Sequence, residues 1–99
     1  MSELRGKDRR YLRGLGNQLR PTVYLGKEGI TAAQIHSLDD AHAKSELVKV
    51  RVERNCPLDR REVGEYIAAA TESHLVQILG NTLLLYRPNP EKPTIILPT

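Results

Sequence analysis

The sequence contains no phenylalanine, no tryptophan and only four tyrosines, so its core must be built from aliphatic side chains. The single cysteine, Cys56, excludes an internal disulfide and a cysteine-based zinc cluster. No apolar run approaches the roughly 20 residues that a bilayer-spanning helix needs. The charged N-terminal residues also lack the apolar centre of a signal peptide. We therefore expect a cytoplasmic protein that does not enter a membrane, and 99 residues suffice for one domain.

Positive charge is concentrated in the first quarter of the chain. Residues 1–27 hold seven basic and two acidic residues, a net charge of +5, whereas residues 28–99 carry a net charge of −2. A basic segment on a nearly neutral body favours a polyanionic partner, although a solvated helix face is the commoner explanation of a charge run.

Hydrophobic periodicity predicts three helices and four strands. The helices cover 6–18, 32–44 and the segment after Asp59 to about Ala70, and the strands cover 22–25, 47–53, 75–79 and 82–87. Thr31 and Gln34 form a capping box at the start of the second helix, and Gly80-Asn81 is a hairpin turn. This order predicts an α/β two-layer sandwich, α-β-α-β-α-β-β, with a mixed four-stranded sheet.

The same periodicity assigns core residues. In the first helix the apolar arc contains Tyr11, Leu12, Leu15 and Leu19. In the second strand Val48, Val50 and Val52 face the core, so Lys49 and Arg51 project from the opposite face. In the third helix the predicted buried residues are Val63, Tyr66, Ile67 and Ala70. With Tyr11 and Tyr66 in the core, little aromatic surface would remain for stacking on nucleobases.

Residues 88–99 differ from the rest because they contain four prolines and show no period. We expect an extended arm whose Ile95, Ile96 and Leu97 dock on the body, and a domain that covers 1–87.

Candidate enzyme sites fail on spacing. His36 and His42 are six residues apart on one helix, about 120° around its axis, and cannot share a metal ion without a third ligand from elsewhere. Each histidine, His74 included, is expected to be a surface or hydrogen-bonded residue, and Cys56 has no evident activating partner. No set of nucleophile, base and orienting group can be assembled, so we expect no enzyme activity, no cofactor, no metal and no small-molecule substrate.

A Gly-x-x-Gly turn, Gly26-Lys27-Glu28-Gly29, connects the first strand to the capped helix. Glycines on both sides of a turn allow the backbone to approach a phosphate, with exposed N–H groups as donors. KH modules clamp a nucleic-acid backbone with such a loop. By itself the pattern favours an ordinary strand-to-helix turn, so its context decides.

That context resembles a known family. The matching segments occur in order and without large gaps: Lys7 to Leu15, Leu19-Arg20-Pro21, Leu25 to Thr31, Glu46 to Val50, and Val76 to Arg87. Together they resemble the CRM domain, the chloroplast RNA-splicing and ribosome-maturation family, in its single-domain bacterial form. The resemblance implies a strand order of 1-2-4-3 with strand four antiparallel, as in the C-terminal domain of translation initiation factor three. It also implies binding to ribosomal RNA in precursor particles of the large subunit.

The resemblance and the charge pattern together predict an RNA-binding surface. Its expected residues are Lys7, Arg9, Arg10, Arg13, Arg20, Gly26, Lys27, Gly29, Lys49 and Arg51. Glu28 adds an acid to the loop, and we expect it to lower the affinity. The predicted protein is a monomeric ribosome-assembly factor that reads structured RNA by its shape. The alternative is a non-enzymatic adaptor for an acidic partner, either a ribosome-associated protein or a translation factor.

Overall fold

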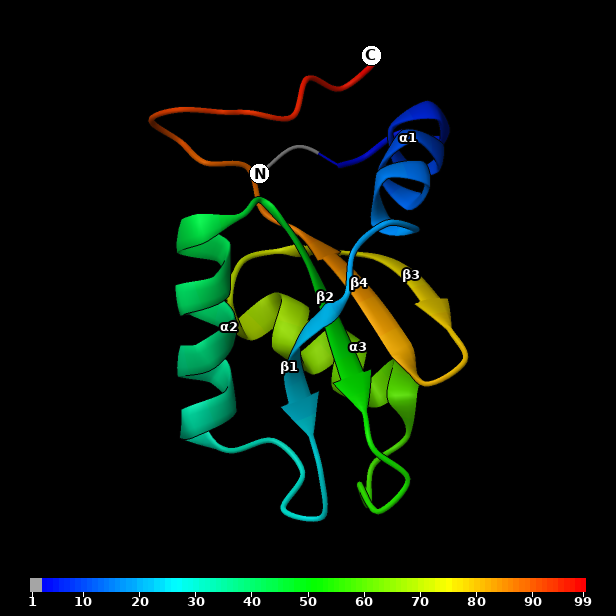
Figure 1. Ribbon diagram of the computed structural model, residues 1–99, viewed down its shortest axis with the longest axis vertical. Helices are drawn as coiled ribbons and strands as arrows, with labels where there is room; N and C mark the ends of the chain where they lie inside the picture. Colours follow the sequence, from blue (N-terminus) through cyan, green and yellow to red (C-terminus); the bar gives the residue numbers. More distant parts are fainter. Residues whose placement is uncertain (1–2) are drawn as a thin grey trace.

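The computed structural model describes residues 3–99, which form three helices and one four-stranded sheet (Figure 1). The elements are α1 (Gly6–Gly16), β1 (Pro21–Leu25), α2 (Ala32–Lys44), β2 (Leu47–Val52), α3 (Arg60–Ala70), β3 (His74–Leu79) and β4 (Thr82–Tyr86). All seven predicted elements are present, and their ends differ from the predicted ones by two residues or fewer.

The sheet has the strand order β1-β2-β4-β3. β1 pairs with β2 in parallel, and β4 pairs antiparallel with both β2 and β3. The predicted α/β class, element order and mixed sheet are therefore confirmed.

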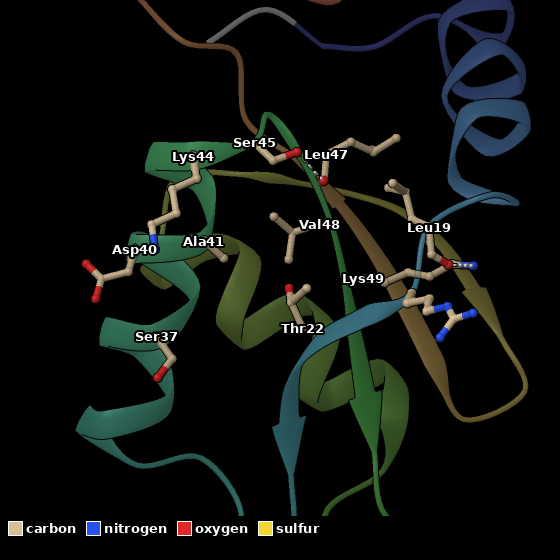
Figure 2. Close-up of a pocket in the computed structure, with 11 residues that line it drawn as sticks. Leu19, Thr22, Ser37, Asp40, Ala41, Lys44, Ser45, Leu47, Val48 and Lys49 are labelled. Carbon is tan, nitrogen blue, oxygen red and sulfur yellow. Dashed lines mark hydrogen bonds between the residues drawn. The ribbon is translucent and has the colours of Figure 1, made fainter.

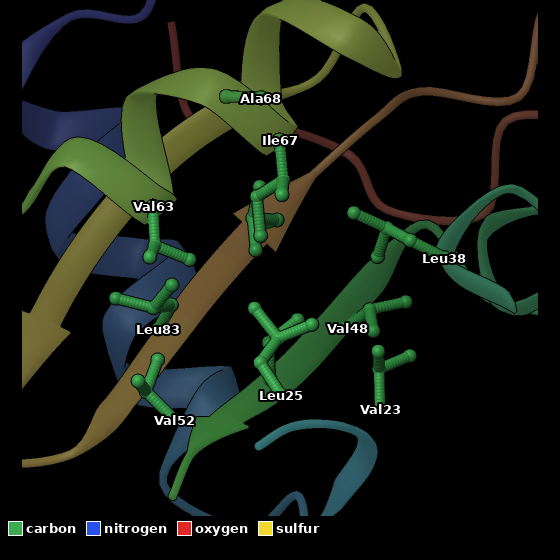
Figure 3. Packing of buried hydrophobic residues seen from close by; sticks show 11 residues of the cluster. Val23, Leu25, Leu38, Val48, Val52, Val63, Ile67, Ala68 and Leu83 are labelled. Atoms are coloured by element: carbon green, nitrogen blue, oxygen red, sulfur yellow. The ribbon is translucent and has the colours of Figure 1, made fainter. Parts of the chain in front are cut away.

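The face of the sheet under α2 and α3, which we call the closed face, carries the larger hydrophobic core. Figure 3 shows Leu38 of α2 and Ile67 of α3 directed toward the strands. The buried members from the sheet are Val23, Leu25, Val48, Val50, Val52, Leu83 and Leu85. These side chains alternate along each strand, so every second residue of β1, β2 and β4 points to the other face.

The other face, which we call the open face, carries α1. Leu12 of α1 packs there with Leu47, Val76, Leu84 and Tyr86. Figure 1 shows α1 beside the upper part of the sheet only. The two-layer description thus holds for the sheet with α2 and α3, while α1 adds a partial cover on the opposite side.

Four core assignments on the helices are wrong. Tyr11 and Leu15 of α1 are exposed, and so are Tyr66 and Ala70 of α3. On α1 the buried residues form a narrow stripe at a spacing of four, Asp8, Leu12 and Gly16, because the helix contacts the sheet along one line.

On α3 the buried stripe runs through Gly64 and Ala68 instead. A Cβ atom on Gly64 would come within 2.8 Å of Leu75 Cδ2, so the glycine allows the helix to approach β3 closely. This approach turns Tyr66 and Ala70 toward solvent.

Local hydrogen bonds set the helix starts as predicted. The N–H of Thr31 donates to Gln34 Oε1 at 3.2 Å, which completes the expected capping box of α2. Asp59 Oδ2 accepts the N–H of Arg61 at 3.1 Å at the start of α3.

Two buried carboxylates hold the C-terminal residues against the open face. Glu46 Oε1 accepts the N–H groups of Thr94 and Ile95 at 2.9 and 2.7 Å, and Glu46 Oε2 accepts the N–H of Asn89 at 2.6 Å. Asp8 accepts the hydroxyl of Thr99 at 2.6 Å. Residues 88–99 therefore form an arm that returns to α1.

The arm docks through two of its three predicted side chains. Ile95 and Leu97 pack against the cluster around Leu12, as expected. Ile96, which was also expected to dock, is exposed.

Candidate nucleic-acid interface

The loop 26–29 is a tight turn at the end of β1. The N–H of Gly29 donates to the carbonyl of Gly26 at 2.9 Å, and Gly29 has a φ of +69°, which an L side chain rarely adopts. Gly29 is therefore a requirement of the turn. Gly26 differs, because a Cβ atom there would meet only Asn55 Oδ1, at an ordinary 3.6 Å.

Between the two glycines, Lys27 and Glu28 are exposed. Within residues 3–99 neither of their N–H groups has a hydrogen-bond acceptor. The loop thus offers two free backbone donors beside the Lys27 ammonium, and this combination suits a phosphate. The carboxylate of Glu28 opposes it.

The predicted cations of α1 are not equivalent. Lys7 and Arg10 are exposed, and Arg13 is half-buried. Arg9 donates from Nη1 to the carbonyl of Leu75 at 2.9 Å, so part of its hydrogen-bonding capacity joins α1 to β3. Arg20, in the connection to β1, is exposed.

Lys49 and Arg51 lie on the open face, as predicted from the alternation of β2. Lys49 Nζ donates to the carbonyl of Leu19 at 3.2 Å and so holds the chain that leads from α1 to β1. Arg51 lies 3.7 Å from Glu53, Nε to Oε2, in an exposed ion pair. Such a pair contributes only about 1 kcal/mol or less, so Arg51 is available to an anionic ligand.

The predicted residues do not meet in one pocket. Figure 1 shows α1 at the upper end of the long axis and the loop 26–29 at the lower end. The molecule extends 38 Å along that axis. Lys49 and Arg51 lie along β2 between the two groups, so a ligand that contacts both α1 and the loop must run along the open face.

A groove of about 440 Å³ lies between α2 and the α1–β1 connection (Figure 2). Its cations are Arg20, Lys44 and Lys49, and its floor includes Val48. Lys44 was not among the residues predicted from the sequence, because its charge stands alone in a nearly neutral segment. Figure 2 shows Lys44 and Asp40 extending from the same helix, so the groove carries charges of both signs.

The three histidines have different environments. His36 is exposed and lies 3.3 Å from Asp40. The ring of His74 stacks on Tyr86, and burial together with the charge of Arg9 lowers the pKa of His74.

His42 contradicts the expectation of a surface or hydrogen-bonded histidine. It is buried on α2, and neither ring nitrogen makes a hydrogen bond of good geometry within residues 3–99, although the backbone of Ser45 and Glu46 lies close enough to favour the charged form. Burial, reinforced by the nearby charge of Arg87, lowers the pKa of His42 to about 4. The imidazole is therefore neutral at physiological pH.

The pKa values of two acidic groups on the open face, Glu46 and Asp8, are also lowered. Burial would raise the pKa of Glu46, but the hydrogen bonds from Asn89, Ile95 and Thr94 outweigh it and lower the pKa. The hydrogen bond from Thr99 likewise lowers the pKa of Asp8. Both carboxylates are ionised at neutral pH and serve to hold the arm.

Metal-binding clusters and membrane-spanning helices are both absent from residues 3–99. No group of three His, Cys, Asp or Glu residues there could hold a metal ion. No helix in this part of the chain is long and apolar enough to cross a membrane.

Comparison with known proteins assigns the family. A sequence model of the CRS1/YhbY (CRM) domain matches residues 4–87. The chain belongs to the CRM domain family. The match confirms the family resemblance that was predicted from the sequence motifs.

CRM relatives cover nearly the whole chain. The "Probable RNA-binding protein YqeI" of Bacillus subtilis is 38% identical over 95 residues, which are 96% of this chain and 99% of the relative. An "RNA-binding protein" of Haemophilus influenzae is 33% identical and matches 92% of each chain.

A solved structure agrees with the fold. The solution structure of the hypothetical protein SAV1595 from Staphylococcus aureus, a protein proposed to bind RNA, superposes with a TM-score of 0.83. It is 40% identical in sequence, and the match covers 97% of this chain and 100% of that one.

Proposed function

We propose that this CRM protein binds RNA along its open face, with α1 at one end of the binding surface and the loop 26–29 at the other. Lys7, Arg10, Arg13 and Arg20 would neutralise phosphates, and the free N–H groups of Lys27 and Glu28 would set the position of the backbone. The single observation that carries the proposal is that α1, which bears exposed cations, packs on the same face of the sheet as the side chains of Lys49 and Arg51. The CRM relatives named as RNA-binding proteins support it.

A triple variant, Arg10→Ala with Arg13→Ala and Lys27→Ala, tests both ends of this surface. The expected result is weaker binding to fragments of ribosomal RNA and a log affinity that depends less steeply on log salt. Loss of three phosphate contacts changes that slope by about 2 for single-stranded RNA, because each contact contributes about 0.7. Filter binding over a series of salt concentrations measures both quantities.

The matched control removes the same net charge elsewhere. Arg61 lies exposed on α3, and Lys92 lies exposed in the arm. Arg61→Glu with Lys92→Ala lowers the net charge by three, as the triple variant does. Equal losses in the two variants would indicate that only overall charge matters, and would contradict the proposed surface.

Gly26→Ala tests the loop without disturbing the fold. The added methyl group meets only Asn55 Oδ1, at an ordinary van der Waals distance of 3.6 Å, yet it lies next to the free N–H groups of the loop. We expect unchanged thermal unfolding and weaker binding. Unchanged affinity would show that no phosphate approaches the loop backbone, while leaving the role of the α1 cations intact.

The RNA we propose is ribosomal RNA in precursors of the large subunit, and the role is assistance in assembly. Sedimentation of a cell lysate tests this assignment. The protein should migrate with large-subunit precursor particles and leave them after ribonuclease treatment or at high salt. Release from the particles by high salt but not by ribonuclease would instead favour an acidic protein partner.

A further inference from the structure

Past the end of α1, one row of the open face remains uncovered. Strand pairing defines its members: Tyr24 of β1 lies beside Arg51 of β2, Arg51 beside Thr82 of β4, and Thr82 beside Leu79 of β3. We call these four residues the end row. The row crosses the whole sheet, at the edge from which the loop 26–29 departs.

All four side chains point away from the closed face. Their neighbours Val23, Leu25, Val50, Val52 and Leu83 belong to the core under α2 and α3. Successive residues of a strand alternate between faces, so the end row shares its face with Leu84, on which α1 rests.

The end row exposes large apolar side chains. Tyr24 is 52% exposed and Leu79 is 61% exposed, although each stands on a sheet whose other face is buried. One row closer to α1, Leu84 is buried. The cover by α1 thus ends between two adjacent rows, and the end row is the part left open.

The Tyr24 side chain lies along its own strand. Its hydroxyl donates to the carbonyl of Pro21 at 3.4 Å, a long hydrogen bond that directs the ring along β1. Exposed tyrosines on a sheet provide stacking surfaces for bases, because every base has a π-face.

Two cations lie at the end row beside its exposed tyrosine. Arg51 stands beside Tyr24, and Lys27 follows three residues later in the loop. Their acidic neighbours are Glu53, the exposed ion-pair partner of Arg51, and Glu28, which follows Lys27 in the loop. A ligand with a π-face and a negative backbone matches this combination better than an acidic peptide does.

We propose that the end row is a platform for unpaired nucleobases. Tyr24 stacks on one base, Arg51 on the next strand binds the adjacent phosphate, and Leu79, about 14 Å from Tyr24 across three strand spacings, contacts a base further along the RNA. This inference rests on the proposed function and deepens it: the RNA at this end of the protein is single-stranded. It replaces the expectation of recognition by shape alone, which assumed that Tyr11 and Tyr66 were buried, whereas they are 44% and 60% exposed.

The test compares the affinities of wild type and Tyr24→Ala for two probes, a short oligoadenylate and a blunt duplex of the same length. Loss of one stacked base predicts an affinity for the oligoadenylate about 5- to 150-fold lower, with no change in the salt dependence, because no charge is removed. Tyr24→Phe retains the ring and should bind within about twofold of wild type. Tyr66→Ala removes an equally exposed tyrosine from α3 and should change nothing.

Ring-labelled tyrosine gives a second readout by NMR, since the protein has only four tyrosines and no tryptophan. Stacked adenine should shift the ring signals of Tyr24 upfield and leave those of Tyr66 in place. Wild-type affinity of Tyr24→Ala, or ring shifts confined to other tyrosines, would overturn the platform. The proposed function is tested separately by the triple variant of Arg10, Arg13 and Lys27. If Tyr24→Ala binds like wild type but the triple variant binds ribosomal RNA more weakly than wild type, the platform fails and the proposed function stands. If the wild-type protein binds neither probe nor ribosomal RNA, both proposals fail.

Discussion

The two faces of the sheet differ in how completely they are covered. The closed face is covered by α2 and α3 and filled with aliphatic side chains at alternating strand positions. The open face is covered only in part, by α1 and by an arm that two carboxylates hold in place. This difference indicates that the closed face supplies most of the stability, while the open face leaves sheet surface and cations accessible.

The largest expected effect compares two leucines that are both fully buried. Leu83→Ala on the closed face should lower the free energy of unfolding by about 3–5 kcal/mol, and Leu12→Ala on the open face by about 2–3 kcal/mol. The second cavity borders α1 and the arm, which can move to fill it. Urea unfolding measures both, with the exposed Ile96→Ala as a control near zero. Equal losses would contradict the proposed division between the faces.

The next effect concerns His42 of α2, whose buried ring nitrogens have no hydrogen bond of good geometry within residues 3–99. His42 has a pKa of about 4 when folded and 6.5 as a free side chain, so the unfolded state binds the proton more tightly. Protonation of His42 therefore leaves the free energy of unfolding unchanged above about pH 6.5. Below that pH the free energy of unfolding falls as the pH drops toward 4, by about 3 kcal/mol in all.

His42→Leu should remove this pH dependence and raise stability at pH 7 by about 1–2 kcal/mol, because a desolvated imidazole without partners is lost. Thermal unfolding at several pH values provides the measurement. A variant less stable than wild type at pH 7 would mean that the ring forms hydrogen bonds after all.

On the open face, Glu46→Gln tests how the arm is held. The carboxylate accepts several hydrogen bonds from the arm, and an amide cannot accept them all, so we expect a loss of about 1–3 kcal/mol. The amide hydrogens of Thr94 and Ile95 should exchange faster, while those of β4 stay protected.

Acid should have the same effect as this substitution. The folded pKa of Glu46 is below its ordinary 4.5, so the contribution of the carboxylate is present above that pH and is lost as the pH falls through the folded value. Arm amides that remain protected in Glu46→Gln would refute the anchoring role.

The smallest expected effect is on affinity. Glu28→Lys removes the acid that opposes Lys27 in the loop, and it should tighten RNA binding by up to about fivefold at low salt, the range of one exposed charge contact. Glu65→Lys makes the same change of charge on α3 and serves as the control. Equal tightening by both variants would assign the gain to net charge alone.

Much of the fold was predictable because its signals are local. The alternation of Val48, Val50 and Val52 and the capping box of Thr31 each depend on residues within one element. The loop 26–29 was equally visible, since a turn that needs positive φ selects glycine. The CRM motifs then supplied the strand order.

The side-chain assignments that failed depend on contacts between elements. Tyr66 belongs to the apolar arc of its helix, but Gly64 lets α3 settle against Leu75 and so turns Tyr66 outward. The exposure of Tyr24 could not be predicted from its strand, because it depends on where α1 ends above the sheet. Likewise, the sequence around Glu46 predicts an ordinary surface acid. Its burial and its hydrogen bonds arise only because the arm folds back over it.

The amino-acid sequence alone therefore determined the elements, their order and the cationic character of the first quarter, because these follow from periodicity, capping and charge count. The tertiary structure decided which face α1 covers, which tyrosines meet solvent and how far α1 lies from the loop 26–29. These properties arise from packing between segments distant in the chain, and periodicity within one element carries no information about such packing.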